Sequence, residues 1–260
     1  MNASSQSGPI WWIFGFSLLA SAGAICLTGS FLLLRPGIRQ RLVPHLISYA
    51  IGTLLGAAFL GLLPHALADI PASNVFAVFL AGIVVFIVLE RLMLWRHCHE
   101  AHCEVHSGSG VLILIGDGVH NFVDGILIAA TFLTSVPLGI ATSLAIVSHE
   151  VPQEVGDFAI LLESGYSAAR AFLLNLVSGA STLVGALLAY LWLPHLHSAV
   201  PYFMALAAAG FVYVAMADLV PGLHRCASPK QCAAHLILIV AGMGTMGLFH
   251  LGNHADLVGS

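Results

Sequence analysis

The chain has 260 residues, of which 59% are hydrophobic and only 8% charged, and its mean hydropathy is +0.97. These values exclude an ordinary soluble globular domain and predict a polytopic membrane protein. The formal net charge of -4 gives no indication of a nucleic-acid partner.

Apolar runs of about 20 residues, the length that crosses a bilayer, occur eight times along the chain. They are Ile10–Leu34, Pro44–Leu63, Val75–Trp95, Val111–Leu133, Val136–Leu162, Ala171–Leu193, Val200–Val220 and Cys232–Leu251. They leave no room for a soluble domain, so residues 1–260 are expected to form a single all-α transmembrane unit. The polar residues 1–9 lack the basic residues of a signal peptide.

All eight basic residues fall on the same side of these segments, in the loops after segments one, three, five and seven or at the ends of those segments. They are Arg35, Arg39, Arg41, Arg91, Arg96, Arg170, Arg225 and Lys230. The positive-inside rule makes that side cytoplasmic and places both termini outside the cytoplasm. We therefore expect a multi-pass protein of a bacterial inner membrane or a plasma membrane, with a homodimer as the candidate assembly.

Segments four and five carry polar side chains at bilayer depth. Residues three or four apart share a helix face, so segment four has one polar stripe and segment five a broad polar face. The residues are Asp117, His120, Asn121 and Asp124 in segment four, and His149, Glu150, Gln153, Glu154 and Asp157 in segment five. A single Asp at mid-membrane costs roughly 2.5–3.5 kcal/mol. These groups must therefore face one another, water or a cation.

The two polar faces are predicted to meet at one depth. A short turn around residues 134–137 makes segments four and five antiparallel, and equal counting from it places His120 level with His149. Imidazole, amide and carboxylate groups suit Zn²⁺, Cd²⁺, Fe²⁺ or Mn²⁺, whereas a Mg²⁺ or Ca²⁺ cage does not need histidines. One such residue often only links two helices, but nine on facing helices indicate a metal site.

These residues resemble the motifs of the ZIP (Zrt-, Irt-like protein) family of divalent-metal transporters. The stretch HNFVDG, from His120 to Gly125, is similar to the fourth-helix HNxxEG-type motif. The stretch HEVPQEVGD, from His149 to Asp157, is similar to the fifth-helix HExPHExGD-type signature of one subfamily. Eight spans, termini outside the cytoplasm and a His-rich loop between segments three and four also resemble this family.

The resemblance implies two neighbouring metal positions on segments four and five. The first would be lined by His120, Asp124, His149 and Gln153, and the second by Asn121, Glu150 and Gln153. The family usually has Glu at the position of Asp124, and His or Glu at that of Gln153, so a bridging ligand here would be neutral. Whether one or two ions bind is therefore open.

A single metal is the main expectation. Its principal ligands would be His120, Asp124, His149 and Glu150, with Glu154 as a nearby acid or alternative ligand. Asp117 and Asp157 lie on the predicted cytoplasmic halves of their segments, where they would mark an exit path.

Segments two and seven end in similar sequences. Segment two ends outward at Leu62-Leu63-Pro64, and segment seven ends inward at Leu219-Val220-Pro221. An inverted repeat relating segments one to three with six to eight would produce this pattern and would leave segments four and five as the central pair.

The predicted cytoplasmic loop 97–109 is a second candidate for metal binding. It contains His97, Cys98, His99, His102, Cys103 and His106. This density of ligands favours metal binding by composition, but the spacing does not match a folded zinc module. We expect a flexible acceptor or sensor; the alternative is a solvated polar loop.

Together these features predict a transporter that moves a divalent transition metal, first of all zinc, into the cytosol, and neither an enzyme nor a resident cofactor is expected. One alternative is an intramembrane zinc-dependent hydrolase, because His149-Glu150-Val-Pro-Gln153 differs from HExxH only at its last ligand. Gln153 is a poor substitute for that histidine, and Pro152 interrupts the helix. The other alternative is a metal exporter, which would normally show six spans and a cytosolic C-terminal domain.

Overall fold

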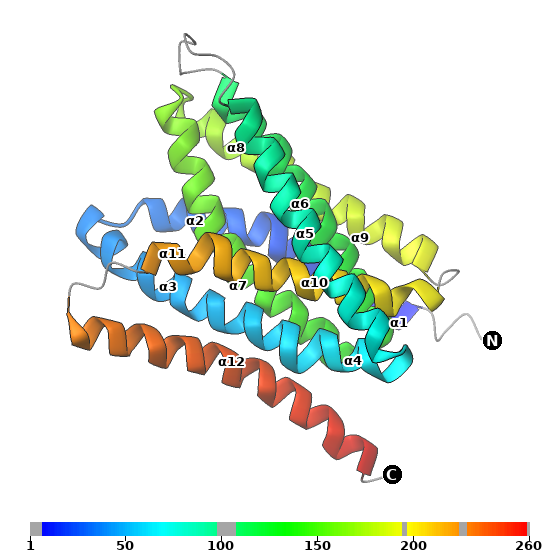
Figure 1. The fold of residues 1–260 in the computed structure, drawn as a ribbon. Coiled ribbons are helices and arrows are strands. Elements are labelled where there is room, and N and C mark those ends of the chain that lie inside the picture. Colours follow the sequence, from blue (N-terminus) through cyan, green and yellow to red (C-terminus); the bar gives the residue numbers. More distant parts are fainter. Residues whose placement is uncertain (1–6, 98–107, 194–196, 224–227, 259–260) are drawn as a thin grey trace.

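The computed structural model describes residues 7–97, 108–193, 197–223 and 228–258, and every regular element within these ranges is a helix (Figure 1). Each predicted apolar segment corresponds to one helical stretch, although Ile10–Leu34 runs two residues past the end of α2 and Ala171–Leu193 one residue past the end of α9. The first four stretches are α1 (Ser7–Leu18) with η2 (Leu19–Gly23) and α2 (Ala24–Leu32); α3 (Pro36–Gly56) with η3 (Ala57–Leu62) and α4 (Leu63–Asp69); α5 (Ala72–His97); and α6 (Gly108–Thr134). The remaining ones are α7 (Val136–Glu163); α8 (Ala168–Gly179) with α9 (Ser181–Trp192); η5 (His197–Ala199) with α10 (Val200–Tyr213), η6 (Val214–Leu219) and α11 (Val220–Leu223); and α12 (Pro229–Val258).

Six of these stretches are long and apolar enough to cross a membrane, judged by length and composition within the described residues. The chain is thus a multi-pass membrane protein. Helices α6 and α7, with 27 and 28 residues, are also long enough to span but are not among the six. Their polar side chains lower their hydropathy. The count of eight spans therefore stays a prediction.

Segments two and seven contain the same irregularity. In each, a π-helix of six residues leads directly into an α-helix whose second residue is proline, Pro64 in α4 and Pro221 in α11. Proline has no N–H to donate and crowds the carbonyl four residues earlier, which widens the preceding turn. The inverted repeat stays a prediction, and it would place these two irregularities in equivalent positions.

The packing of the outer helices is compatible with this predicted repeat. Helix α3 packs along α12, and α10 packs along α5, pairs that the inverted repeat would interchange. A Cβ atom on Gly52 would meet the carbonyl oxygen of Ile239, and one on Gly242 would lie 2.5 Å from the carbonyl oxygen of Tyr49. Because both residues are glycines and have no side chain, α3 and α12 can approach each other closely.

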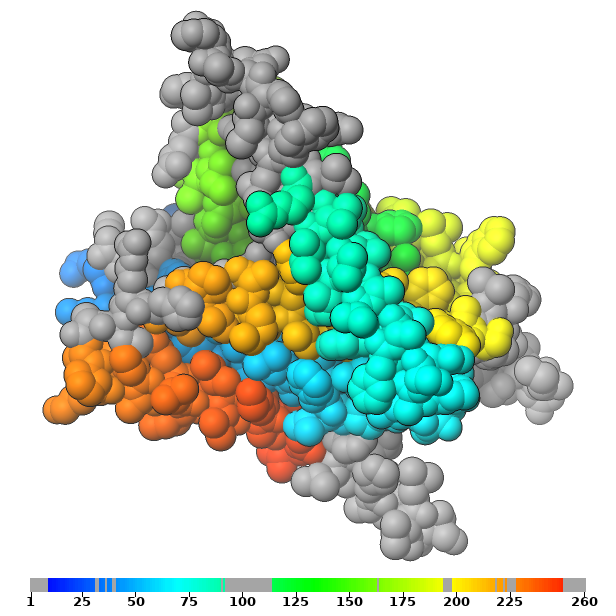
Figure 2. Space-filling view, in the orientation of Figure 1, coloured from blue at the N-terminus to red at the C-terminus, as the bar shows by residue number. Residues whose placement is uncertain are grey.

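Apolar side chains cover the outside of the molecule. Only 11% of the α5 span and 17% of the α12 span are buried. Large exposed residues such as Leu80 on α5 and Val240 on α12 face outward, as expected where lipid is the solvent. In the space-filling view, α3, α5, α10 and α12 form the near face and cover much of α7 behind them (Figure 2).

Helices α6 and α7 form the predicted antiparallel pair. They are separated only by Ser135, whose Oγ accepts a hydrogen bond of 3.3 Å from the N–H of Leu138 and caps α7. Helix α6 also packs closely on α9, because a Cβ on Gly125 would meet the carbonyl oxygen of Thr182 and one on Gly185 that of Phe122. These contacts hold the polar stripe of α6 between α7 and α9.

Candidate metal site

Four side chains from α6 and α7 converge in the interior. They are His120 and Asp124 on α6 and His149 and Glu150 on α7, and one potential ligand atom from each lies within 4.8 Å of those of the others. The sequence predicted these four as the principal ligands, and the structure brings them together.

The separations between these atoms fit a small divalent cation. The two histidine Nε2 atoms are 3.1 Å apart. His149 Nε2 lies 3.3 Å from Asp124 Oδ2 and 3.4 Å from Glu150 Oε1, and His120 Nε2 lies 3.8 and 3.6 Å from the same two oxygens. A tetrahedral Zn²⁺ with bonds of about 2.0–2.1 Å would hold its ligand atoms about 3.3–3.4 Å apart. Small side-chain shifts would therefore complete such a site.

The backbone of α7 prepares His149 for this role. Its Nδ1 donates a hydrogen bond of 3.1 Å to the carbonyl oxygen of Ala145, since a carbonyl can only accept. The proton is therefore on Nδ1, which leaves the Nε2 lone pair directed at the cluster. Phe211 of α10 packs against the imidazole, with the ring centroids 5.9 Å apart.

The cluster is closed on most sides. His149 and Glu150 are 1% exposed and Asp124 is 3% exposed, whereas the side chain of His120 is 24% exposed. Burial removes water from carboxylates that would otherwise be hydrated, so a bound cation would interact strongly with them.

Asn121 is held by hydrogen bonds on both sides of its amide. Its Nδ2 donates to Asp117 Oδ1 at 2.9 Å and to the Asp117 carbonyl oxygen at 3.2 Å, and its Oδ1 accepts from Thr182 Oγ1 at 2.8 Å. All three residues are buried. In this arrangement Asn121 links α6 to α9.

Gln153 also points its amide at Asp117. Its Nε2 donates a hydrogen bond of 3.2 Å to Asp117 Oδ1. A role for Gln153 or Asn121 as a metal ligand stays a prediction, and in this structure both amide groups orient the carboxylate of Asp117.

The remaining acids lie on one side of the cluster. Asp117 and Glu154 group with Glu150, one oxygen of each within 4.8 Å of the others. Asp157, one turn further along α7, is half-buried and belongs to neither group.

Three contacts around the site were not predicted from the sequence. Ser178 and Ser181 donate to the carbonyl oxygens of Leu114 and Gly118 at 3.0 and 2.6 Å, which fixes α6 against α8 and α9. Thr28 donates to the carbonyl oxygen of Val151 at 3.3 Å. Single hydroxyl residues in apolar segments give no pattern from which these partners could be inferred.

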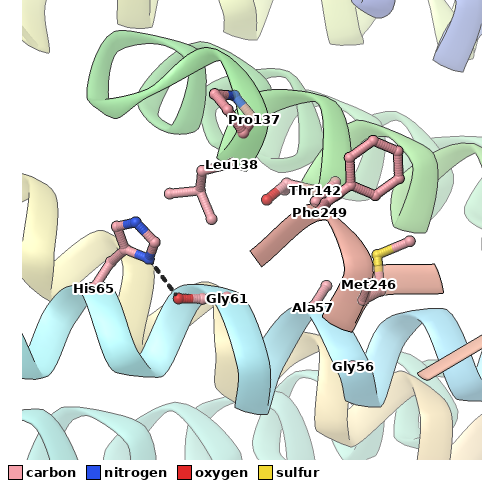
Figure 3. A pocket seen from close by; sticks show the side chains of 10 residues that line it. Gly56, Ala57, Gly61, His65, Pro137, Leu138, Thr142, Met246 and Phe249 are labelled. Carbon is pink, nitrogen blue, oxygen red and sulfur yellow. Dashed lines mark hydrogen bonds between the residues drawn. The ribbon is translucent and has the colours of Figure 1, made fainter. Parts of the chain in front are cut away.

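A small cavity lies away from the cluster, where α7 meets η3, α4 and α12 (Figure 3). Its volume of about 10 Å³ is close to the minimum for one water molecule. Figure 3 shows His65 at one end, with its Nδ1 bonded at 2.8 Å to the carbonyl oxygen of Gly61, and Met246 and Phe249 at the other. None of the proposed ligands lines it.

Most of the predicted metal-binding loop lies outside the part of the chain that the structure describes. Cys98, His99, His102, Cys103 and His106 lie outside the described residues, and the side chain of His97, the last residue of α5, is not described either. Its role stays a prediction.

The family model described as "ZIP Zinc transporter" matches residues 95–250, which include both polar runs. The chain is 34% identical to zinc transporter ZIP13 of Pongo abelii over 222 residues, or 80% of this chain and 66% of that relative. It is 29% identical to zinc transporter YKE4 of Saccharomyces cerevisiae, covering 84% of this chain and 75% of the relative.

A third relative, zinc transporter ZIP4 of Homo sapiens, is 38% identical over 136 residues, or 52% of this chain and 20% of the relative. The chain thus spans about two thirds of ZIP13 and about a fifth of ZIP4. The family model alone covers more than half of the chain, and on this ground the chain belongs to the ZIP zinc transporter family.

Proposed function

We propose that this chain carries a divalent transition metal, zinc first of all, across the membrane into the cytosol. The observation that carries the proposal is the convergence of His120, Asp124, His149 and Glu150 in the interior of a multi-pass membrane protein. The relatives' names, all of them zinc transporters, support zinc as the substrate. Cadmium, iron and manganese fit the same mixture of nitrogen and oxygen ligands.

The arrangement of Glu150 and Gln153 favours transport over hydrolysis. A zinc hydrolase of the HExxH type uses the second histidine as a ligand and the glutamate as the base that activates water. Here Glu150 Oε1 lies 3.4 Å from His149 Nε2, within the cluster, and Gln153 donates to Asp117 instead. Glu150 is thus positioned as a ligand, and no free base remains in the hydrolase position.

We propose import rather than export, and this direction is inferred from the sequence and from the family. The basic residues put both termini outside the cytoplasm, and the loop 97–109 would receive metal on the inner side. The membrane would be a plasma membrane or a bacterial inner membrane, and the protein would act as a homodimer.

Transport requires the ion to exchange its water shell for these four ligands and then to leave them. Two carboxylates and two neutral imidazoles neutralise a divalent charge, so the occupied site has no net charge at bilayer depth. This offsets much of the cost of removing the ion from water. The helices around the site must then open it to one side at a time.

A liposome assay tests the proposal. Purified protein is reconstituted around a metal-sensing dye and exposed in turn to Zn²⁺, Cd²⁺, Mn²⁺, Fe²⁺ and Cu²⁺. We expect saturable Zn²⁺ uptake by the wild type and none by His149→Ala. Protein-free liposomes should give no change in the dye signal. Absence of flux for all five ions would refute transport.

A further inference from the structure

An aromatic ring from a third helix lies against one of the four proposed ligands. The ring of Phe211, on α10, packs on the imidazole of His149 with the ring centroids 5.9 Å apart and the planes at 65°. Phe211 is 4% exposed and His149 is 1% exposed. Because α10 supplies none of the four ligands, Phe211 forms an apolar wall beside the cluster.

The packing of α10 on α5 holds this wall in place. A Cβ atom on Gly210, the residue before Phe211, would lie 2.8 Å from Cζ of Phe86, and one on Gly82 would lie 2.7 Å from a side chain of α10. The two helices therefore approach each other as closely as their glycines allow. A backbone packed in this way leaves the ring of Phe211 little room to move away from His149.

Water has restricted access to the cluster. The side chain of His120 is 24% exposed, whereas Asp124 and Glu150 are 3% and 1% exposed. On the side of α10, the ring of Phe211 offers neither a ligand atom for a metal nor a hydrogen-bonding group for water. An ion at the cluster would therefore keep contact with water mainly at the edge of His120.

The number of ligands distinguishes the candidate ions. Zn²⁺ in proteins is commonly tetrahedral, with four ligands, whereas Mn²⁺ prefers an octahedron of oxygen-rich ligands. The four side chains of the cluster satisfy a tetrahedral ion by themselves. An octahedral ion at the same place needs additional water ligands, and hence space for them.

We infer that Phe211 is a selectivity residue, which favours four-coordinate Zn²⁺ over six-coordinate Mn²⁺ by keeping water away from the ion on the side of α10. This inference rests on the proposed transport function and specifies which of the divalent ions the site prefers. The ligands alone do not decide this, because imidazole and carboxylate groups bind either ion. Phe211 makes no bond to the metal and acts through the shape of the site.

Uptake of zinc and of manganese by the same liposomes tests this role. The full chain is reconstituted around a dye that responds to both ions, and initial rates are measured over a range of concentrations. The test variant is Phe211→Ala, which leaves space beside carboxylates, where water can bind. The matched control is Phe132→Ala, a phenylalanine of α6 that is 3% exposed and whose ring packs on Trp12 and Phe16.

The preference for zinc is measured as kcat/KM for Zn²⁺ divided by kcat/KM for Mn²⁺. We expect this ratio to fall by about tenfold or more in Phe211→Ala and to stay within about twofold of the wild type in Phe132→Ala. Phe211→Leu, which keeps an apolar side chain but removes the ring, gives the same test if Phe211→Ala does not fold. Loss of packing alone would lower both rates together, and an unchanged ratio in a folded variant would overturn the inference.

Co²⁺ spectroscopy reports the number of ligands directly, because tetrahedral Co²⁺ absorbs visible light strongly and six-coordinate Co²⁺ absorbs it weakly. The spectrum of the interior site is the difference between each protein and its His149→Ala derivative, which removes the absorption of ions bound elsewhere. We expect a strong difference spectrum for the wild type and Phe132→Ala and a weak one for Phe211→Ala. A strong, tetrahedral spectrum in Phe211→Ala would contradict the proposed role.

The two measurements separate this inference from the proposed function. Absence of uptake of either ion by the wild type would remove transport, while the Co²⁺ spectra would still decide the role of Phe211. Zinc uptake with the same ion preference in the wild type and Phe211→Ala would leave transport standing and remove that role.

Discussion

His120 and His149 are 29 residues apart in the chain, yet their Nε2 atoms lie 3.1 Å apart. The contact joins α6 to α7 at the centre of the helix pair. Without an ion the two rings share one proton in a hydrogen bond, and with an ion both lone pairs can bind it.

Replacing either histidine should remove zinc transport. His120→Ala and His149→Ala each delete one of the four proposed ligands, and we expect zinc flux into liposomes to fall at least a hundredfold because the remaining three would hold the ion too weakly. His195→Ala, a histidine outside the described residues, serves as the control and should retain flux. Comparable flux in all three variants would remove the assigned site.

The hydrogen bond from Thr182 to Asn121 should matter for metal affinity. Thr182→Val keeps the shape of the side chain but leaves Asn121 Oδ1 buried without its donor, at a cost of about 1–3 kcal/mol. We expect zinc affinity, measured by titration calorimetry, to fall about tenfold. Thr134→Val is the matched control, because that hydroxyl bonds the Ala130 carbonyl of its own helix. Equal affinities in the two variants would contradict a supporting role for Thr182.

Gln153→His should increase the affinity for zinc and slow its transport. An imidazole at this position adds a nitrogen ligand of the type zinc prefers, so we expect about tenfold tighter zinc binding and slower turnover in liposomes. The two quantities are measured on the same preparation, by calorimetry and by dye flux. Unchanged affinity would show that residue 153 does not reach the ion.

Gly125 and Gly185 should be required for the packing of α6 on α9. In Gly125→Ala the new Cβ meets the backbone of Thr182, which cannot move aside as a flexible side chain would. We expect a loss of about 1–3 kcal/mol in stability, seen as a lower Tm in detergent. Gly244→Ala, where nothing lies within 4 Å of the added Cβ, is the control. Equal Tm values would mean that α6 and α9 pack less closely than described.

The loop 97–109 should modulate transport without being needed for it. Deleting His97–His106 removes the concentrated ligands but leaves the interior cluster intact, so we expect zinc uptake to persist with altered release or regulation. Flux is compared with that of a chain in which the same ten residues are replaced by Gly and Ser. Complete loss of uptake by a well-expressed deletion would contradict this.

Much of the fold follows from the sequence because lipid imposes simple rules. A helix is the form that satisfies its own backbone hydrogen bonds, so apolar runs such as Val136–Leu162 predict helices well, here α7 (Val136–Glu163). The predicted ends are less accurate, because helices continue past the apolar run, as α12 (Pro229–Val258) does beyond Cys232–Leu251. The π-helices around Ala57 and Val214 were not predicted, since they depend on how a proline strains the turn before it.

The convergence of His120, Asp124, His149 and Glu150 could be predicted for a similar reason. Helical spacing and a short turn determine which faces meet, and this brought His120 level with His149. The hydrogen-bond partners of Gln153 and Asn121 could not be predicted, because a side-chain amide offers both a donor and an acceptor. Their neighbours Asp117 and Thr182 determine which atom faces inward, and those contacts exist only in the folded chain.

The uneven exposure of the four proposed ligands would determine how a bound ion exchanges. Asp124, His149 and Glu150 are sealed in the protein, and His120 alone presents an accessible edge. Water can therefore displace one ligand before the others, so dissociation would proceed stepwise, beginning with the His120 bond. The strength of that single bond would set the residence time of the ion, while the three enclosed ligands would decide which element is retained.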